Sequence, residues 1–423
     1  MKIQSLKGTN DILPSEIKKW QLLENACRTL FELYGYEEIR TPIIEKSELF
    51  KRSVGEATDI VQKEMFIFRD KAERSICLRP EETAAVARAY IQHNLANKTG
   101  MAKLYYMGPM FRSERPQAGR YRQFNQFGAE AIGSYSPHLD AELIALMDEL
   151  VTKMGLKEYD ILINSLGCKK DRQTYKKKLL DYSLKDKNII DKLCSDCQKR
   201  IKSNPLRVLD CKNPECRKLV NKLPTPKDCL CQDCQDHYSK VKTLLDSLKI
   251  KYIEDPLLVR GLDYYNRTTF ELVHGGLGAQ NAILAGGRYD NLISSFGGAD
   301  TGACGFAGGM ERLILACEAE KINLPLKDSI SVYIVTLDES FYKYGFDILH
   351  TLRKSGIKAH ISYEAKSLKA QMRQANKLNS RFAIIIGEDE VKSKKYTLKD
   401  MQEHEQELID KKTLLNKIIK LNA

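Results

Sequence analysis

Two strand-like segments, 103–111 and 122–130, carry the polar residues best spaced to bind a charged ligand. Because successive side chains of a strand point to opposite faces, we expect Gln126 and Glu130 on one face, with Gly128 leaving room between them. An amide and a carboxylate across such a gap suit a cationic or N–H-bearing ligand. The same pattern is common on the exposed face of an antiparallel sheet, so spacing alone leaves both interpretations open.

The polar loop between these segments contains several arginines and a turn with Pro116 and Gly119. We interpret the whole stretch as a hairpin with a long basic loop. Arg112 stands at the mouth of that loop, where its guanidinium could bind a phosphate through two hydrogen bonds.

Three further segments place an arginine beside glycine: 258–265, 286–290 and 305–313. The first contains Arg260-Gly261, and the last ends near Arg312. Glycine lets the backbone approach a ligand closely. None of these segments has the spacing of a P-loop or of a dinucleotide-binding fingerprint. Taken singly, each is a weak signal, because an arginine in a loop is usually solvated.

Seven of the twelve cysteines lie between Cys194 and Cys234. In a reducing compartment, clustered cysteines are metal ligands or plain thiols more often than disulfides. The two C-x-x-C pairs, Cys194/Cys197 and Cys231/Cys234, could form one tetrahedral structural zinc site, although their separation exceeds that of the usual zinc ribbon. Cys211, Cys216 and Cys229 leave the ligand set open.

The elements that must position these residues alternate irregularly between helix and strand. Apolar residues at helical spacing predict helices over 15–34, 81–95, 138–154 and 310–320. Strand character appears over 36–40, 159–163, 259–273, 280–285 and 301–306. This order predicts an α+β core in which helices cover an antiparallel sheet.

The rest of the chain has a different pattern. Residues 169–240 are Lys-rich, Cys-rich and helical in spacing, and 321–327, with Pro325, reads as a linker. Beyond it, strands and helices alternate, which predicts a small α/β domain with parallel strands. The expected strands are 331–336, 358–362 and 382–387, the expected helices are 341–355 and 367–378, and a final strand and helix follow.

Composition and charge restrict the class of protein. The 423 residues are 43% hydrophobic and 29% charged, which is globular and excludes collagen-like, coiled-coil and wholly disordered chains. The net charge of +12 is concentrated in residues 169–240 (+9) and 328–423 (+4), which hints at a polyanionic partner. No segment is apolar enough to span a bilayer and residues 1–10 contain no signal-peptide core, so we expect a cytoplasmic protein with no membrane partner.

Taken together and in their order along the chain, the polar, arginine and glycine segments described above resemble those of the class II aminoacyl-tRNA synthetases. Among these enzymes they resemble the histidyl-tRNA synthetases. Residues 108–117 resemble motif 2 of that class and residues 305–313 resemble motif 3. The segments 260–265 and 286–290 are similar to two segments peculiar to the histidine enzymes. The remaining similar segments are 7–11, 79–83 and motif 1, formed by 15–34 with Glu38–Pro42.

The resemblance implies a fold and an assembly. It implies a class II α+β catalytic core over 1–168 and 241–325, with an antiparallel sheet and helices. A helical insertion domain over 169–240 would contact the acceptor arm of tRNA, and an α/β anticodon-binding domain would span 328–423. Motif 1 implies a homodimer.

The implied activity is that of a histidine–tRNA ligase. Such an enzyme activates L-histidine with ATP and Mg²⁺ to histidyl-adenylate plus pyrophosphate, then transfers histidine to its tRNA. By the family pattern, the catalytic residues would be Arg112 and Arg260, on either side of the α-phosphate that the histidine carboxylate attacks. Arg312 would bind the γ-phosphate end of ATP and Glu114 the adenine region.

The histidine would be held by a second group of residues, besides the two catalytic arginines. Glu81, Thr83 and Gln126 match the family residues that bind the α-amino group. Glu130 and Tyr265 match those that bind opposite edges of the imidazole, and the pocket would be lined by Tyr264 and Tyr289.

One alternative is a non-catalytic synthetase paralogue that serves as regulatory subunit of ATP phosphoribosyltransferase. Such paralogues typically lack the anticodon-binding domain and an intact Arg260 segment. Because the sequence contains both features, we favour the ligase.

Overall fold

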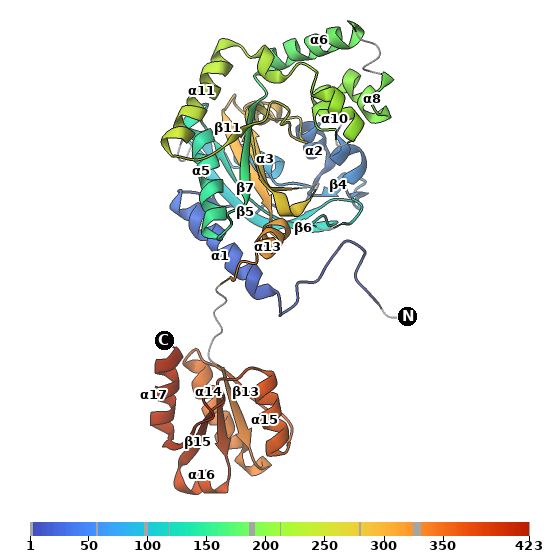
Figure 1. Ribbon diagram of the computed structural model, residues 1–423. Coiled ribbons are helices and arrows are strands. Elements are labelled where there is room, and N and C mark those ends of the chain that lie inside the picture. The colour runs from blue at the N-terminus through green and yellow to red at the C-terminus, as the bar shows by residue number, and fades with distance from the viewer. Residues whose placement is uncertain are drawn as a thin grey trace. The chain divides into compact units, whose positions relative to one another are not determined.

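The computed structural model describes residues 3–55, 58–96, 100–117, 119–185, 191–211, 213–278, 281–324 and 331–422 (Figure 1). The chain divides into two compact units, Met1–Leu324 and Pro325–Ala423. Most of the expected linker, 321–327, therefore falls at this junction, and its residues 325–327 lie outside the described residues.

An eight-stranded sheet forms the centre of the first unit, in the order β1-β5-β6-β11-β10-β9-β7-β8. All inner pairs are antiparallel, and only the edge pairs β1/β5 and β7/β8 are parallel. This confirms the expected antiparallel core. The strands are β1 (Glu37–Glu38), β5 (Ala102–Phe111), β6 (Gln123–Ile132), β7 (Tyr159–Ser165), β8 (Ile253–Glu254), β9 (Asn266–His274), β10 (Ala282–Arg288) and β11 (Ala303–Gly309).

Helices pack on this sheet through apolar stripes. Helix α1 (Ile17–Leu33) buries five side chains at helical spacing, from Trp20 to Phe31. They join one core with α5 (Pro137–Lys153), α11 (Gln232–Ser247), α13 (Met310–Ala319) and the sheet itself. Helix α3 (Thr83–Gln92) belongs to a second core, on which the site described below is built.

A small three-stranded sheet was not anticipated from the sequence. Its order is β2-β4-β3, formed by Ile44–Lys46, Ser75–Leu78 and Ile67–Arg69, and helix α2 (Ser47–Val54) packs beside it. Strands of three or four residues leave too short a pattern to be recognised by alternation.

The Cys-rich part of the chain is helical, as its spacing predicts, and lies at one end of the sheet in Figure 1. Its elements are α6 (Lys169–Lys185), α8 (Ser195–Ser203), α9 (Leu206–Leu209), α10 (Pro214–Val220), a 3₁₀ turn (Pro226–Cys229) and α11. The expected boundary at residue 240 falls inside α11, whose Tyr238, Val241 and Leu245 pack in the main core.

Residues 258–265 form a loop, so the strand predicted over 259–273 is wrong in its first half. The strand β9 starts only at Asn266. The carbonyl groups of Asp263 and Tyr265 accept hydrogen bonds from the Arg172 side chain, at 3.2 and 3.0 Å, instead of from a neighbouring strand. A tertiary contact therefore replaces the sheet ladder here.

The second unit has a five-stranded sheet in the order β13-β12-β14-β15-β16. Strands β12 (Ser331–Thr336), β13 (Lys358–Ile361) and β14 (Phe382–Ile386) are parallel, as expected. Strand β15 (Lys395–Asp400) is antiparallel both to β14 and to β16 (Gln406–Asp410), which corrects the all-parallel expectation and the expectation of a single final strand. A short turn joins β15 to β16, and a connection of that kind pairs strands antiparallel. The helices are α14 (Tyr342–Lys354), α15 (Leu368–Lys377), α16 (Glu388–Ser393) and α17 (Lys411–Asn422).

Candidate active site

Four arginines from three separate segments of the sequence line one cavity of the first unit. Arg112 follows β5, Arg120 lies in the β5–β6 loop, Arg260 lies in the 258–265 loop and Arg312 lies in the first turn of α13. Burial lowers the pKa of Arg112, Arg120 and Arg312, and the pKa of Arg312 is lowered further by Arg120 and Arg112. Like charges brought this close favour an anionic ligand with several charges.

Backbone and aromatic contacts hold two of these arginines in place. The Nε of Arg112 donates a 2.9 Å hydrogen bond to the carbonyl of Pro80, and its guanidinium lies 5.1 Å from the ring centre of Phe124. Arg312 donates from Nη1 to the carbonyl of Ala282 at 2.8 Å and from Nε to that of Gly119 at 3.2 Å. These carbonyl groups fix the orientation of both guanidinium groups and carry no net negative charge themselves.

Carboxylates compensate part of this charge. Glu114 is buried, forms an ion pair with Arg120 and lies 3.9 Å from Nη1 of Arg112. Arg260 forms an ion pair with Glu271 at 3.3 Å. Glu311 also lines the cavity, and its carboxylate accepts the backbone N–H of Asn125 at 2.8 Å.

Strand β6 alternates as its sequence predicts. Phe124 and Gln126 line the arginine cavity, whereas Gln123 and Asn125 line a separate depression. The Oε1 atom of Gln126 is buried and has no hydrogen-bond partner among the described residues. A buried amide oxygen without a donor is costly, so a ligand N–H would be favourable there.

Glu130 lies deeper along the same strand and is only 1% exposed. Three hydroxyl groups surround its carboxylate: Thr83 at 2.6 Å, Tyr289 at 2.5 Å and Tyr106 at 3.3 Å. Burial raises the pKa of Glu130 to about 8, with nearby Glu81 adding to the shift against the hydrogen bonds that lower it. The site therefore holds a buried carboxyl group that binds a proton more readily than a solvated glutamate does.

Sequence reasoning missed Tyr106, although a signal was present. Tyr106 pairs directly with Gly128 in the β5/β6 register. A Cβ at residue 128 would lie 2.5 Å from the Tyr106 hydroxyl oxygen, so glycine is required there. The room that Gly128 leaves is thus filled by the tyrosine that contacts Glu130.

The start of helix α3 brings Glu81 and Thr83 to the same place. The Glu81 carboxylate accepts the backbone N–H groups of Thr83 and Ala84 at 2.8 and 3.0 Å. Burial raises the pKa of Glu81. The nearby Arg79–Glu82 ion pair, 2.8 Å and buried, fixes the turn that precedes the helix.

Three tyrosines from two segments form an aromatic wall next to Glu130. The ring centres of Tyr264 and Tyr265 are 4.6 Å apart, and Tyr289 lies 5.7 Å from Tyr264 and 6.5 Å from Tyr265. All three are buried. The two segments 260–265 and 286–290, separate in sequence, are therefore one structural feature.

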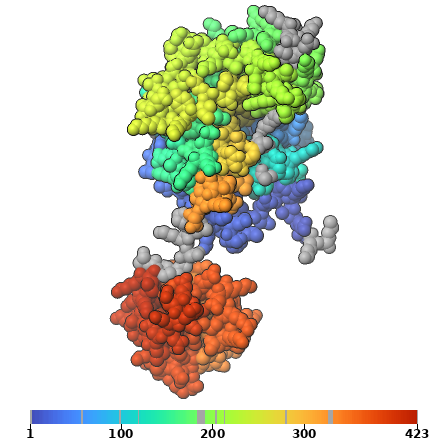
Figure 2. Space-filling view, viewed as in Figure 1, coloured from blue at the N-terminus to red at the C-terminus, as the bar shows by residue number. Residues whose placement is uncertain are grey.

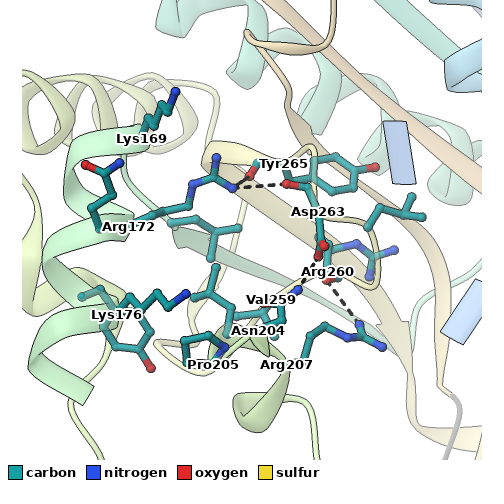
Figure 3. A pocket seen from close by; sticks show the side chains of 15 residues that line it. Lys169, Arg172, Lys176, Asn204, Pro205, Arg207, Val259, Arg260, Asp263 and Tyr265 are labelled. Carbon is teal, nitrogen blue, oxygen red and sulfur yellow. Dashed lines mark hydrogen bonds between the residues drawn. The ribbon is translucent and has the colours of Figure 1, made fainter. Parts of the chain in front are cut away.

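A second cavity, of 320 Å³, shares Arg260 and Tyr265 with this region (Figure 3). Its other wall comes from the Cys-rich insertion and contains basic residues that the sequence analysis had not singled out, among them Lys169, Arg172, Lys176 and Arg207. Figure 3 shows Asn204 and Arg207 directed at the 258–265 loop. Asn204 donates to the Asp263 carboxylate at 2.7 Å and Arg207 to the Arg260 carbonyl at 3.5 Å.

The proposed zinc ligand set is wrong. Cys194 and Cys197 group with Cys211 and Cys216, whereas Cys231 and Cys234 group with other residues, Cys168 and Asp171. The physical reason is the fold of the insertion: α8 and α10 bring the first group together, while the N-terminus of α11 packs on that of α6. The C-x-x-C spacing shows which cysteines are neighbours in sequence, but it gives no information on which other residues lie beside each pair in the fold.

Within the described part of the chain, no helix is long and apolar enough to cross a membrane.

Comparison with known proteins identifies relatives over the whole chain. The family model described as histidyl-tRNA synthetase matches residues 8–313, and the model described as anticodon-binding domain matches residues 331–421. A histidine–tRNA ligase of Halothermothrix orenii is 48% identical over 421 residues, covering 100% of both chains. One of Thermotoga maritima is 47% identical, covering 97% of each chain.

Solved structures of histidyl-tRNA synthetases and of related proteins are also similar to this chain. Apo histidyl-tRNA synthetase of S. aureus is 39% identical and matches with a TM-score of 0.84, covering 99% of this chain and 100% of that one. A Bacillus halodurans protein described as an ATP phosphoribosyltransferase regulatory subunit/histidyl-tRNA synthetase matches with a TM-score of 0.65 at 22% identity, covering 91% of this chain and 98% of that one. That second likeness is one of fold.

Proposed function

Because the chain belongs to the histidyl-tRNA synthetase family and its activity is the ATP-dependent joining of histidine to tRNA, we propose which of its residues carry out each step. The observation that carries the proposal is the convergence of four arginines on one cavity beside the hydroxyl-bound carboxyl of Glu130. The arginines suit a polyphosphate, and the carboxyl of Glu130 suits an amino acid whose ring carries an N–H group.

Activation joins two anions, the histidine carboxylate and the α-phosphate of ATP. Arg112 and Arg260 are the catalytic residues: they neutralise these groups from opposite sides and stabilise the charge of the transition state. Arg112 is anchored on the Pro80 carbonyl and Arg260 on Glu271, so neither must reorganise at the moment of attack.

The remaining nucleotide contacts fall to two other residues that line the cavity. Arg312 binds the γ-phosphate end and Glu114 the adenine region. Magnesium arrives with ATP. Of the carboxylates that line the cavity, that of Glu311 would offer oxygen donors to this hard cation, which otherwise keeps phosphate and water ligands.

Histidine binds between β6 and the start of α3. Its α-amino group meets Glu81, Thr83 and Gln126, and the buried Gln126 Oε1, without a partner among the described residues, supports this role. Its carboxylate lies between Arg112 and Arg260.

The imidazole is read by Glu130 and Tyr265 from opposite edges, with Tyr264 and Tyr289 lining the pocket. The three hydroxyls on Glu130 support this role, because they hold the carboxyl in one orientation. A ring without the matching nitrogen would leave these buried groups unpaired, which can reject a substrate by about 10⁴-fold.

We assign the tRNA contacts to the two basic parts of the chain. The insertion over 169–240, at +9, would contact the acceptor arm, and 328–423, at +4, the anticodon. The rest of the chain, 1–168 and 241–325, would form the catalytic core. Lys169, Lys176 and Arg207 in the cavity of Figure 3 support an RNA-facing role for the insertion.

We further propose a homodimer that acts in the cytoplasm, where tRNA is charged for translation. Exposed apolar side chains near motif 1 support the dimer: Ile43, Ile44, Ile67 and Phe68 are each 41–51% exposed. Sedimentation of the wild type and of Phe68→Ser tests it. A wild-type monomer at micromolar concentration would contradict the dimer.

The regulatory alternative is not supported, since the anticodon-binding model matches residues 331–421 and the full-length relatives are histidine–tRNA ligases.

Histidine-dependent ATP–pyrophosphate exchange tests the assignment of Arg112. Arg112→Gln should lower exchange by about 100-fold or more, because a preorganised charge is lost from the transition state. Arg115→Gln is the matched control, as Arg115 is exposed on the same loop and lies outside the lining of the cavity. Equal effects of the two substitutions would contradict the assignment.

A further inference from the structure

We propose that Cys194, Cys197, Cys211 and Cys216 bind one structural zinc ion in the insertion. Their four sulfur atoms all lie within 4.8 Å of one another. Cys197, Cys211 and Cys216 are buried, and Cys194 is partly buried. Four thiols at one buried point are the donor set of a closed, structural zinc site.

The distances fit a single tetrahedral ion. With Zn–S bonds of about 2.3 Å, the sulfurs of a tetrahedral site stand about 3.8 Å apart. The sulfurs of Cys194 and Cys211 are 3.9 Å apart, which is also far too long for a disulfide. The backbone N–H of Cys194 donates to the Cys216 sulfur at 3.0 Å, a bond that favours a thiolate.

The four ligands come from separate short elements. Cys194 caps α8 and Cys197 lies in its first turn, Cys211 follows α9, and Cys216 lies in α10. These helices have nine, four and seven residues. Helices this short are not stable alone in water, so something must tie them together.

Apolar burial in this part of the chain is small. Among the described residues from 193 to 223, the buried apolar side chains other than the cysteines are Leu193, Ile201, Val208, Leu209, Val220 and Leu223. These side chains join the second core, which α3 shares, and a metal ion bound by the four thiols would add folding free energy to this segment.

The second group, Cys168, Asp171, Cys231 and Cys234, serves as the comparison. Its sulfur and carboxylate atoms are equally close, but both oxygens of Asp171 already accept backbone N–H groups, those of Cys168 at 3.1 Å and Cys231 at 3.0 Å. We assign no metal to it.

The ion would hold α8, which Asn204 follows, and α9, which contains Arg207, and both of these side chains contact the 258–265 loop. This consequence rests on the proposed catalytic role of Arg260, whereas the zinc site does not.

Metal analysis of the full-length chain, purified without chelators, tests the site. The wild type should contain zinc at near-unit stoichiometry or above, and Cys211→Ser and Cys216→Ser should each contain about one equivalent less. Cys231→Ser, the matched control, should retain that equivalent. Wild type without zinc, or Cys211→Ser with the same zinc content as the wild type, would overturn the proposal.

A second measurement covers the case in which the variants misfold. In the wild type, alkylation followed by peptide mass mapping should find these four thiols protected, and a zinc chelator should expose them. Cys27 and Cys304, fully buried in the main core, should stay protected throughout. Unchanged protection of the four thiols, in protein whose metal has been removed, would overturn the proposal even if zinc co-purifies.

Discussion

The side-chain amide of Asn204 donates a 2.7 Å hydrogen bond to the carboxylate of Asp263. Asn204 belongs to the insertion, and Asp263 lies three residues after Arg260 in the loop that we place at the α-phosphate. Arg172 and Arg207 add hydrogen bonds to the carbonyl groups of the same loop. The insertion therefore supports the 258–265 loop as well as carrying positive charge.

We expect Asn204→Ala to lower kcat of ATP–pyrophosphate exchange by about 10-fold, since small displacements of a catalytic group are costly. The KM for histidine should change less. Asn204→Asp should be worse than alanine above neutral pH, because it places a carboxylate against Asp263. Lys218→Ala, at an exposed ion pair of the same insertion, is the control. Equal kcat in Asn204→Ala and wild type would contradict this positioning role.

Replacing Arg260 should impair adenylate formation without weakening the binding of tRNA. Arg260→Ala should cut adenylate formation by about 100-fold or more while tRNA affinity, measured by filter binding, stays close to that of wild type. Arg260→Lys keeps a charge but not the planar guanidinium and should recover part of the rate. Unchanged exchange in Arg260→Ala would count against the assigned role.

Glu130 should make stability fall as pH rises. With a pKa of about 8 in the folded protein and an ordinary value near 4.5 unfolded, the folded state binds more protons between these values. Unfolding is therefore favoured progressively from about pH 4.5 to 8. Glu130→Gln cannot ionise, so its Tm should drop less than that of wild type between pH 5 and 8. Parallel Tm curves for the two proteins would refute this.

The same substitution tests recognition of the ring. Glu130→Gln replaces one of the two carboxylate oxygens by an NH2 donor and removes the negative charge that we assign to binding of the imidazole N–H, so the KM for histidine should rise and discrimination against other amino acids should weaken. Exchange assays with each amino acid measure both. An unaltered KM and selectivity would remove Glu130 from the imidazole-binding residues.

Asp140 should matter for stability and not for histidine recognition. Its carboxylate forms a buried ion pair with Arg288 at 2.6 Å, which together with His237 holds its pKa near 2 despite burial. Asp140→Asn should lower the free energy of unfolding by about 3–5 kcal/mol in urea titrations. The pair's contribution should be lost as pH falls from about 4 towards 2. The exposed Glu48→Gln should change stability far less, and an equal effect would contradict the buried pair's importance.

Local pattern predicted most elements of the first unit, because its helices bury regular apolar stripes and its long strands alternate. Helix α1 was predicted over 15–34 and runs Ile17–Leu33, and the β5–β6 hairpin was recognised from its two strands. The short strands β2 and β3 were not predicted, and neither was the antiparallel pairing of β15 with β16. Strands β2 and β3 have three residues each, which is too short a pattern for a local signal. Strands β15 and β16 are close in sequence, and only a single final strand was expected there.

The sequence by itself determined the chemistry available: which arginines stand beside glycine, which carboxylate and amide share a face of β6, and where the cysteines and positive charge accumulate. Motif order was enough to indicate the family. Only the tertiary structure decided which of these groups meet. It placed Tyr106 and Tyr289 on Glu130, tied the insertion to the loop of Arg260, and separated Cys194 from Cys231. The reason is physical: spacing along a strand or helix sets local direction, whereas contact between distant segments is set by how the elements pack.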